Sequence, residues 1–279
     1  MLDKLFHYFS YDIAWYALIV AVLVALCASV FGVILVLKRM SFIGDGLSHV
    51  AFGATAVAAV IGLTNSVLVV MPVTMLCAVI LLKSGKSKRL HGDASIAVIS
   101  VGALGLGYLL MKIFPRGNAN IEGDVCTSLF GAQSILSLEL SEVIFCIVMA
   151  VIALAVFVIA YNKIFSVTFD EDFSKAVGIN TSLYNLMIAL VTALIIVLAM
   201  NLVGSLLASA LIIFPALSSM RMCRSFKGVM ISSAIVSVLA AAGGLILALL
   251  LSLPVGPAIV VINMAVFGIF SLVGAILKR

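Results

Sequence analysis

The side chains with the clearest capacity for chemistry are a carboxylate and an imidazole placed four residues apart in an otherwise apolar stretch. The stretch reads MSFIGDGLSHVAFGA, Met40 to Ala54, and holds Asp45 and His49. Residues four apart on a helix are separated by only about 40° around its axis, so these two side chains share one face. Ser41 and Gly53 continue the same line in either direction. The spacing therefore predicts a polar stripe along one helix.

A carboxylate oxygen and an imidazole nitrogen together suit borderline divalent ions such as Zn²⁺, Mn²⁺ or Fe²⁺. One Asp and one His are too few ligands for a closed structural site, but two copies of the chain around a two-fold axis would supply four. An Asp–His pair at this spacing is a weak signal by itself. A proton relay, or an ion pair that only pins two helices together, therefore remains an open alternative.

The composition places this stripe in a membrane protein. Of the 279 residues, 65% are hydrophobic and only 10% are charged, and the mean hydropathy is +1.38. A soluble domain carries roughly 25% charged residues. The apolar runs are continuous over about 20 residues instead of alternating, which indicates spanning helices and not barrel strands. The first run, Ile13 to Leu37, is too long for a signal peptide core and is read as an uncleaved span.

Hydropathy predicts an all-α, multi-pass protein with about nine transmembrane helices, forming one transmembrane domain over residues 1–279. The predicted spans are 13–37, 44–62, 65–82, 94–113, 140–161, 183–202, 204–220, 229–251 and 257–277.

The basic residues set the expected orientation. With the carboxyl terminus in the cytoplasm, 13 of the 16 Lys and Arg residues fall on the inside, and Lys4, Lys112 and Arg116 remain outside. This bias follows the positive-inside rule, so we expect the amino terminus outside and the carboxyl terminus inside. The net charge of +5 is thereby explained by membrane topology, with lipid as the surroundings and without a nucleic acid partner.

One loop on the predicted inner side contains a short amphipathic helix, within NKIFSVTFDEDFSKAVGIN, Asn162 to Asn180. Thr168 and Glu171 have the spacing of a capping box, Asp170 adds favourable charge at the helix start, and Gly178 can end the helix. The apolar face comprises Phe169, Phe173, Ala176 and Val177. This face either packs on the protein's own bundle or docks a cytoplasmic partner subunit.

Other signals are weaker. Gly85-Lys86-Ser87 lacks the earlier glycine of a phosphate-binding loop, so no nucleotide-hydrolysing site is expected in this chain. The five cysteines form no CxxC pair and are read as small packing residues. Small residues in VGALGLG, Val101 to Gly107, favour close helix packing. Pro215 either lines a pathway with a freed carbonyl or makes an ordinary kink.

The stretch around Asp45 and His49 resembles the segment M-S-x-x-G-D-A-L-S-H-A of permease subunits from bacterial ABC importers for zinc, manganese and iron. Three further stretches resemble segments of that family in the same order. They are DVCTSLFGAQSILSL (Asp124 to Leu138), FDEDFSKAVGIN (Phe169 to Asn180) and VGSLLASALIIFPALSSM (Val203 to Met220). In this chain Gly46 replaces the common Ala of the first segment.

The resemblance implies a multi-pass protein of the bacterial plasma membrane that acts as a homodimer with two cytoplasmic ABC ATPase subunits. An extracytoplasmic metal-binding protein would deliver the ion, and no cofactor would be permanently bound. Asp45 and His49 match the metal-contacting pair in the middle of the translocation path. The segment 169–177 matches the ATPase-coupling helix, and its expected residues are Phe169, Asp170, Glu171, Phe173, Ala176 and Gly178.

The chain itself is expected to perform no covalent chemistry, since it lacks the paired acids or H-E-x-x-H helix of intramembrane enzymes. A metal transporter coupled to an ion gradient, which needs no ATPase, is the alternative.

Overall fold

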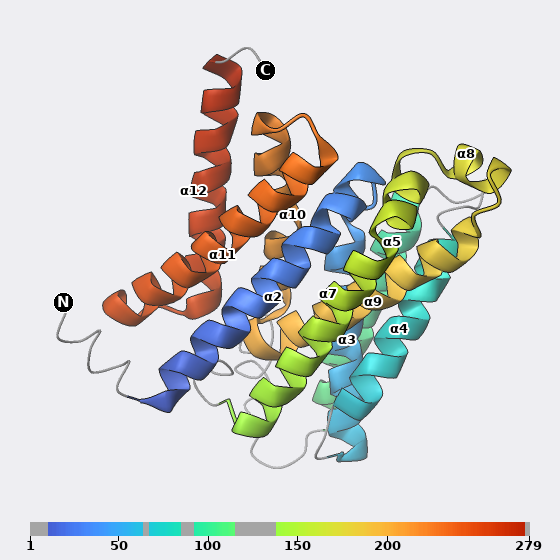
Figure 1. Ribbon diagram of the computed structural model, residues 1–279. Helices are drawn as coiled ribbons and strands as arrows, with labels where there is room; N and C mark the ends of the chain where they lie inside the picture. Colours follow the sequence, from blue (N-terminus) through green and yellow to red (C-terminus); the bar gives the residue numbers. More distant parts are fainter. Residues whose placement is uncertain (1–10, 64–66, 85–91, 115–137, 277–279) are drawn as a thin grey trace.

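The computed structural model describes residues 11–63, 67–84, 92–114 and 138–276, and within these ranges the regular structure is entirely helical (Figure 1). The helices in chain order are α2 (Asp12–Leu37), α3 (Ile43–Ile61), α4 (Val67–Ser84), α5 (Gly92–Ile113), α7 (Leu140–Phe169), α8 (Glu171–Ala176), α9 (Thr181–Val203), α10 (Ser205–Met222), α11 (Phe226–Leu251) and α12 (Val255–Ile276). Each long helix coincides with one span predicted from hydropathy, although α7 runs well past the predicted end at residue 161.

Seven of the described helices are long and apolar enough to cross a membrane, whereas the apolar parts of α4 and α10, Val67–Leu81 and Leu207–Met222, are shorter. A lipid bilayer leaves no water for backbone groups, so apolar segments satisfy their own amides by forming helices. The all-helical, multi-pass fold is confirmed. The number of about nine crossings stays a prediction.

Helix α2 lies at the centre of the bundle, where it packs on α7, α9, α10 and α11. Every residue from Cys27 to Leu35 is buried, which suits a helix that is apolar all around. Two serines of α11 tie it to α2: Ser237 Oγ donates to the carbonyl of Ala25 at 2.8 Å, and Ser233 Oγ donates to that of Ser29 at 3.4 Å. The four described cysteines are free, and Cys27 and Cys146 are buried, as expected of packing residues.

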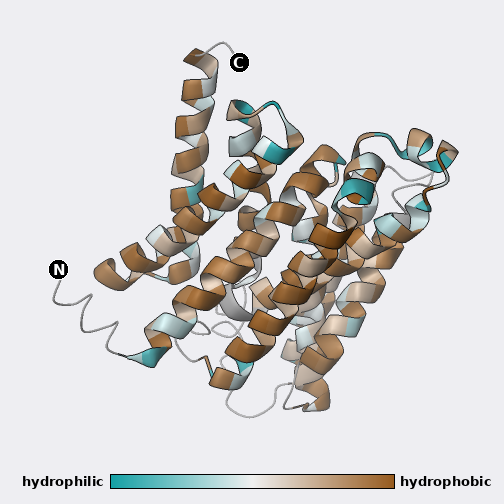
Figure 2. Ribbon diagram, in the orientation of Figure 1, coloured by the Kyte–Doolittle hydropathy of each residue, from teal (hydrophilic) through white to brown (hydrophobic). Residues whose placement is uncertain are grey.

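The outer helices expose large apolar side chains. On α5 and α12 these are Val98, Val101, Leu106, Ile269, Leu272 and Ile276. Figure 2 shows hydrophobic colour along most of α12. Apolar surface of this extent would be unfavourable in water and suits contact with lipid or with another membrane subunit.

Most of the described basic side chains gather at one end of the bundle, and Lys112 in the last turn of α5 is the exception. This end holds the α2–α3 turn, α8, the α10–α11 turn and the end of α12, and hydrophilic colour collects there (Figures 1 and 2). The residues are Lys38, Arg39, Lys163, Lys175, Arg221, Arg224 and Lys227. Their common location agrees with the predicted topology, in which these basic residues lie on the same side of the membrane. The assignment of this end to the cytoplasm stays a prediction.

Close backbone contact between α2 and α10 depends on Gly32. A Cβ atom at this position would lie 2.1 Å from the carbonyl oxygen of Ile212, which is backbone and cannot swing away. A Gly32→Ala substitution should therefore force the two central helices apart. Overpacking of this kind costs about 1–3 kcal/mol, so we expect a lower melting temperature for the detergent-solubilised protein.

Gly105→Ala in α5 is the matched control, because a Cβ there would meet nothing within 4 Å. Equal melting temperatures for the two variants would contradict the close α2–α10 contact.

Candidate functional site

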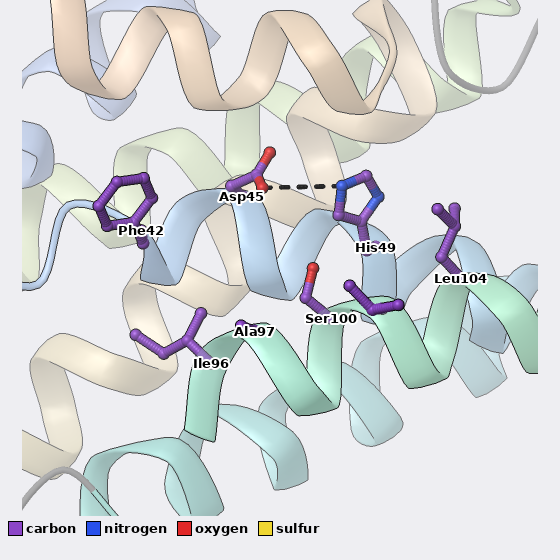
Figure 3. A pocket seen from close by; sticks show the side chains of 8 residues that line it. Phe42, Asp45, His49, Ile96, Ala97, Ser100 and Leu104 are labelled. Atoms are coloured by element: carbon purple, nitrogen blue, oxygen red, sulfur yellow. Dashed lines mark ion pairs between the residues drawn. The ribbon is translucent and has the colours of Figure 1, made fainter. Parts of the chain in front are cut away.

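Asp45 and His49 lie on one side of α3, as the spacing predicted (Figure 3). Helix α3 begins at Ile43, so Asp45 is in its first turn, where the helix dipole favours a negative charge. Ser48 Oγ donates to the carbonyl of Asp45 at 2.7 Å and adds a local contact. The acid therefore sits near the start of α3, and its expected position in the middle of the translocation path stays a prediction.

Helix α5 forms the other wall of the site. Asp45 and His49 line a cavity of about 360 Å³ together with Phe42, Ile96, Ala97, Ser100, Val101 and Leu104. Figure 3 shows Ala97 and Ser100 on α5 facing the α3 stripe. The residues of α5 were not identified from the sequence as site residues, because apolar side chains in a span carry no chemical signal of their own. The small residues of VGALGLG were the available hint.

The two ligand candidates are close without being bonded to each other. Asp45 Oδ2 lies 3.7 Å from His49 Nε2, which is too long for a hydrogen bond. A Zn²⁺ ion about 2.1 Å from each atom would make an O–metal–N angle of about 120°, near tetrahedral geometry. His49 Nδ1 is buried and has no hydrogen-bond partner among the described residues. The observed separation of Oδ2 and Nε2 would therefore let both side chains contact the same ion.

In the part of the chain that the structure describes, one protomer supplies this pair and no third ligand beside it. Within the described ranges, no three His, Cys, Asp or Glu side chains are grouped closely enough to hold a metal ion. The side chain of Asp45 is 42% exposed and that of His49 is 17% exposed, so the cavity is open on the surface of the protomer. A carboxylate facing hydrocarbon costs several kcal/mol, so this surface must face water or another protein in the membrane.

Two other predicted stripe residues have different places. Ser41 lies in the turn before α3, so it does not continue the helical stripe, and that part of the prediction is wrong. Gly53 is a packing position, because a Cβ there would lie 2.8 Å from the carbonyl of Ala103 on α5. A Cβ at Gly107 would lie 3.0 Å from Gly53 Cα, so the predicted close packing by small residues is present here.

Gly46 and Pro215 also adjust packing. A Cβ at Gly46 would approach Ile96 Cγ2 to 2.7 Å, so the absence of the methyl group lets α5 come closer to α3 beside Asp45. Pro215 is buried inside α10, which continues from Ser205 to Met222.

Helix α8 is shorter than predicted and begins differently. It spans Glu171–Ala176, and its N-cap is Asp170, whose Oδ1 accepts a hydrogen bond from the amide of Phe173 at 2.8 Å. Thr168 is still part of α7, and its Oγ1 donates to the carbonyl of Ile164 at 2.6 Å. The predicted Thr168–Glu171 capping box is therefore wrong. Gly178 has φ +86°, the left-handed conformation expected for a helix-ending glycine.

The apolar side of α8 is uncovered. Phe169, Phe173 and Val177 are 58%, 62% and 63% exposed, and Ala176 is exposed as well. Ser174 faces the bundle instead, where its Oγ is 2.7 Å from Ser166 Oγ of α7. Phe169 contacts the rings of Phe165 and Phe226, so the first alternative, packing on the protein's own bundle, holds in part for this residue, whereas Phe173, Ala176 and Val177 remain exposed.

The segment 124–138 that resembles the family's external motif lies almost entirely outside the described residues.

The fold and the site thus define a multi-pass membrane protein with an acid and a histidine in a cavity between two helices, and a short helix with an exposed apolar side at its charged end. The chain belongs to the ABC 3 transport family, whose profile matches residues 10–274. It is the membrane-spanning permease component of an ABC transporter in the inner membrane.

Named relatives cover nearly the whole chain. The zinc uptake membrane protein ZnuB of Haemophilus influenzae is 25% identical over 257 residues, 92% of this chain and 96% of the relative. The manganese import permease ScaB of Streptococcus parasanguinis is 26% identical over 91% of this chain and 88% of its own. The structure of PsaBC from Streptococcus pneumoniae in complex with Fab matches with a TM-score of 0.83 at 24% identity, covering 97% of this chain and 95% of that one.

The two assignments of the α8 cap predict different effects of mutation. Asp170→Ala removes the observed cap, which is worth about 1 kcal/mol, so amide exchange at Phe173 and Ser174 should become about fivefold faster. Thr168→Ala should leave exchange in α8 unchanged, because its hydroxyl bonds back within α7. Hydrogen exchange measured by mass spectrometry distinguishes the two, and the opposite result would restore the capping box.

Proposed function

We propose that this chain is the permease subunit of an ATP-driven importer that moves a divalent transition metal, Zn²⁺, Mn²⁺ or Fe²⁺, into the cytoplasm. The observation that carries the proposal is the Asp45–His49 pair, a nitrogen and an oxygen donor 3.7 Å apart in an open cavity of a membrane bundle. The ion is the cargo of the protein and not a resident cofactor. Zinc and manganese in the relatives' names support this cargo class.

The working unit is a homodimer. One protomer offers two ligands on an open surface, and a second copy facing it across a two-fold axis would supply two more. In an isolated protomer the Asp45 carboxylate would face lipid, which is energetically unfavourable. Pairing of two protomers would remove this contact with lipid. Four ligands from two chains could hold a partly dehydrated ion briefly and release it when the helices move.

The exposed face of α8 supports docking to an ATPase. In the dimer, the two copies of Phe173, with Phe169 and Ala176 beside it, would each insert into a cytoplasmic ATPase subunit, while Asp170 and Glu171 fix the start of the helix and Gly178 its end. This arrangement places the carboxyl terminus inside and the amino terminus outside. An extracytoplasmic metal-binding protein would deliver the ion to a single transmembrane domain formed by residues 1–279.

A transporter coupled to an ion gradient is the rival, and it would not require an exposed docking helix. Uptake of Zn²⁺ or Mn²⁺ into liposomes by the chain alone, driven by a proton or sodium gradient, would favour that rival. Uptake that requires both the ATPase subunits and ATP favours the proposal.

Replacing either candidate ligand tests the site directly. In the complete transporter reconstituted in liposomes, Asp45→Ala and His49→Ala should each lower ATP-dependent uptake of Zn²⁺ or Mn²⁺ at least about tenfold, because each removes half of a protomer's ligands. Assembly with the ATPase subunits should be retained, since neither side chain lies in the packed core.

Asp12→Ala is the matched control, because Asp12 is also an acid in the first turn of a helix and lies at the far end of α2. Wild-type uptake by both site variants would remove Asp45 and His49 from the pathway.

A further inference from the structure

A chain of polar contacts joins α8 to the turn that precedes Asp45. Asn185 Nδ2, in the first turns of α9, donates to Glu171 Oε2 of α8 at 3.2 Å. Asn185 Oδ1 accepts from Lys38 Nζ at the end of α2. The docking helix, α9 and the α2–α3 turn are thus connected through side chains that lie far apart in sequence.

Asn185 is suited to the central position. It is 3% exposed, and a polar side chain buried to this degree needs hydrogen-bond partners. Its amide presents an acceptor to the Lys38 ammonium and donors to the Glu171 carboxylate, so both polarities are matched. An apolar side chain of similar size would fill the space and break both contacts.

Glu171 is held at α8 by further contacts. Its Oε1 accepts from Thr181 Oγ1 at 3.4 Å and lies 3.2 Å from Lys175 Nζ. The hydrogen bond to Glu171 raises the pKa of Lys175. Helix α8 is fastened to the bundle by this polar side, while its apolar side points outward.

The backbone of the turn between Lys38 and Asp45 is constrained by its conformation and by hydrogen bonds. Lys38 caps α2, and Arg39 has φ +57°, a left-handed conformation that is uncommon for a residue with a side chain. The amide of Met40 donates to the carbonyl of Leu35 at 2.8 Å, and the amide of Ile43 donates to the carbonyl of Met40 at 3.1 Å. A displacement of Lys38 is therefore passed to the start of α3.

We propose that Lys38, Asn185 and Glu171 form a relay that transmits movement of α8 to the start of α3 and so reshapes the cavity between Asp45, His49 and α5. This inference rests on the proposed function, because it assumes that α8 receives the movement of an ATPase. The three side chains are positioning residues, since they touch neither the cavity nor the ion. The relay explains how an event at the docking helix reaches the pair without a direct contact.

The test is the Asn185→Leu variant in the complete transporter, with ATPase subunits and metal-binding protein, in liposomes. We expect ATP hydrolysis within about twofold of the wild type, while Zn²⁺ or Mn²⁺ ions moved per ATP fall at least about tenfold. The matched control is Asn263→Leu. Asn263 is 1% exposed, and its Nδ2 donates to Ile259 O in its own helix, so this variant should keep the wild-type ratio.

A second readout does not need a transported ion. A Phe42→Cys substitution places a thiol at the exposed rim of the cavity. The labelling rate of this thiol is measured with and without ATP and vanadate. Labelling of the native cysteines is subtracted as background. Trapping with ATP and vanadate should change the labelling rate when Asn185 is present, and the change should disappear in the Asn185→Leu background. If the wild-type complex moves neither ion, the proposed function fails and this readout still decides the relay.

A second pair of variants guards against poor folding of Asn185→Leu. Lys38→Met should uncouple ATP hydrolysis from uptake, and Lys38→Arg, which keeps a cationic donor, should preserve most of the coupling. Two outcomes would overturn the relay. One is that ATP hydrolysis and ion uptake fall in proportion in these variants. The other is that both Asn185→Leu and Lys38→Met keep the wild-type number of ions moved per ATP.

Discussion

The cost of an acidic side chain in a membrane bundle is the constraint on which the site depends. A carboxylate facing hydrocarbon is unfavourable by several kcal/mol, so Asp45 requires polar neighbours, a helix start or water. The structure provides a position in the first turn of α3, a histidine one turn away and a cavity against α5. Among the described residues this pair has no third ligand beside it, so in the proposed site a second copy of the chain supplies the remaining ligands and covers the open side.

Close helix contact sets the shape of this cavity. Glycines on α3 let α5 approach at Ile96 and at Ala103, and Gly32 lets α10 reach the backbone of α2. In a lipid environment, packing of small residues replaces the hydrophobic effect as the force that joins helices. The same bundle leaves α8 attached by polar groups, because the helix lies beyond the apolar segments. Tight packing inside and polar attachment outside therefore separate the Asp45–His49 cavity from the exposed side of α8, and the proposed relay would connect the two.

Hydropathy and helical spacing predicted the long helices and the shared face of Asp45 and His49, because both follow from local periodicity. These local patterns gave wrong or missing predictions where contacts between residues distant in sequence determine the structure. Thr168 matched a capping box, yet α7 continues through it because Ile164 and Val167 are buried and Phe169 packs on Phe226. The capping box of α7 is instead made by Glu139 and Glu142 at its other end. Asn185 and the α5 wall could not be found, since their roles arise only from neighbours distant in sequence.

The length of α7 has a mechanical consequence. Thirty residues in a single helix make a rod about 45 Å long, while the hydrocarbon core is about 30 Å thick, so the rod must extend beyond the apolar layer or tilt strongly. Helix α8 follows after a single residue, Asp170, and is hydrogen-bonded to α7 through Ser166 and Ser174. A tilt of about 10° in a rod of this length moves its tip by roughly 8 Å. A small tilt of α7 within the bundle would therefore become a displacement of several ångströms at the end that carries α8.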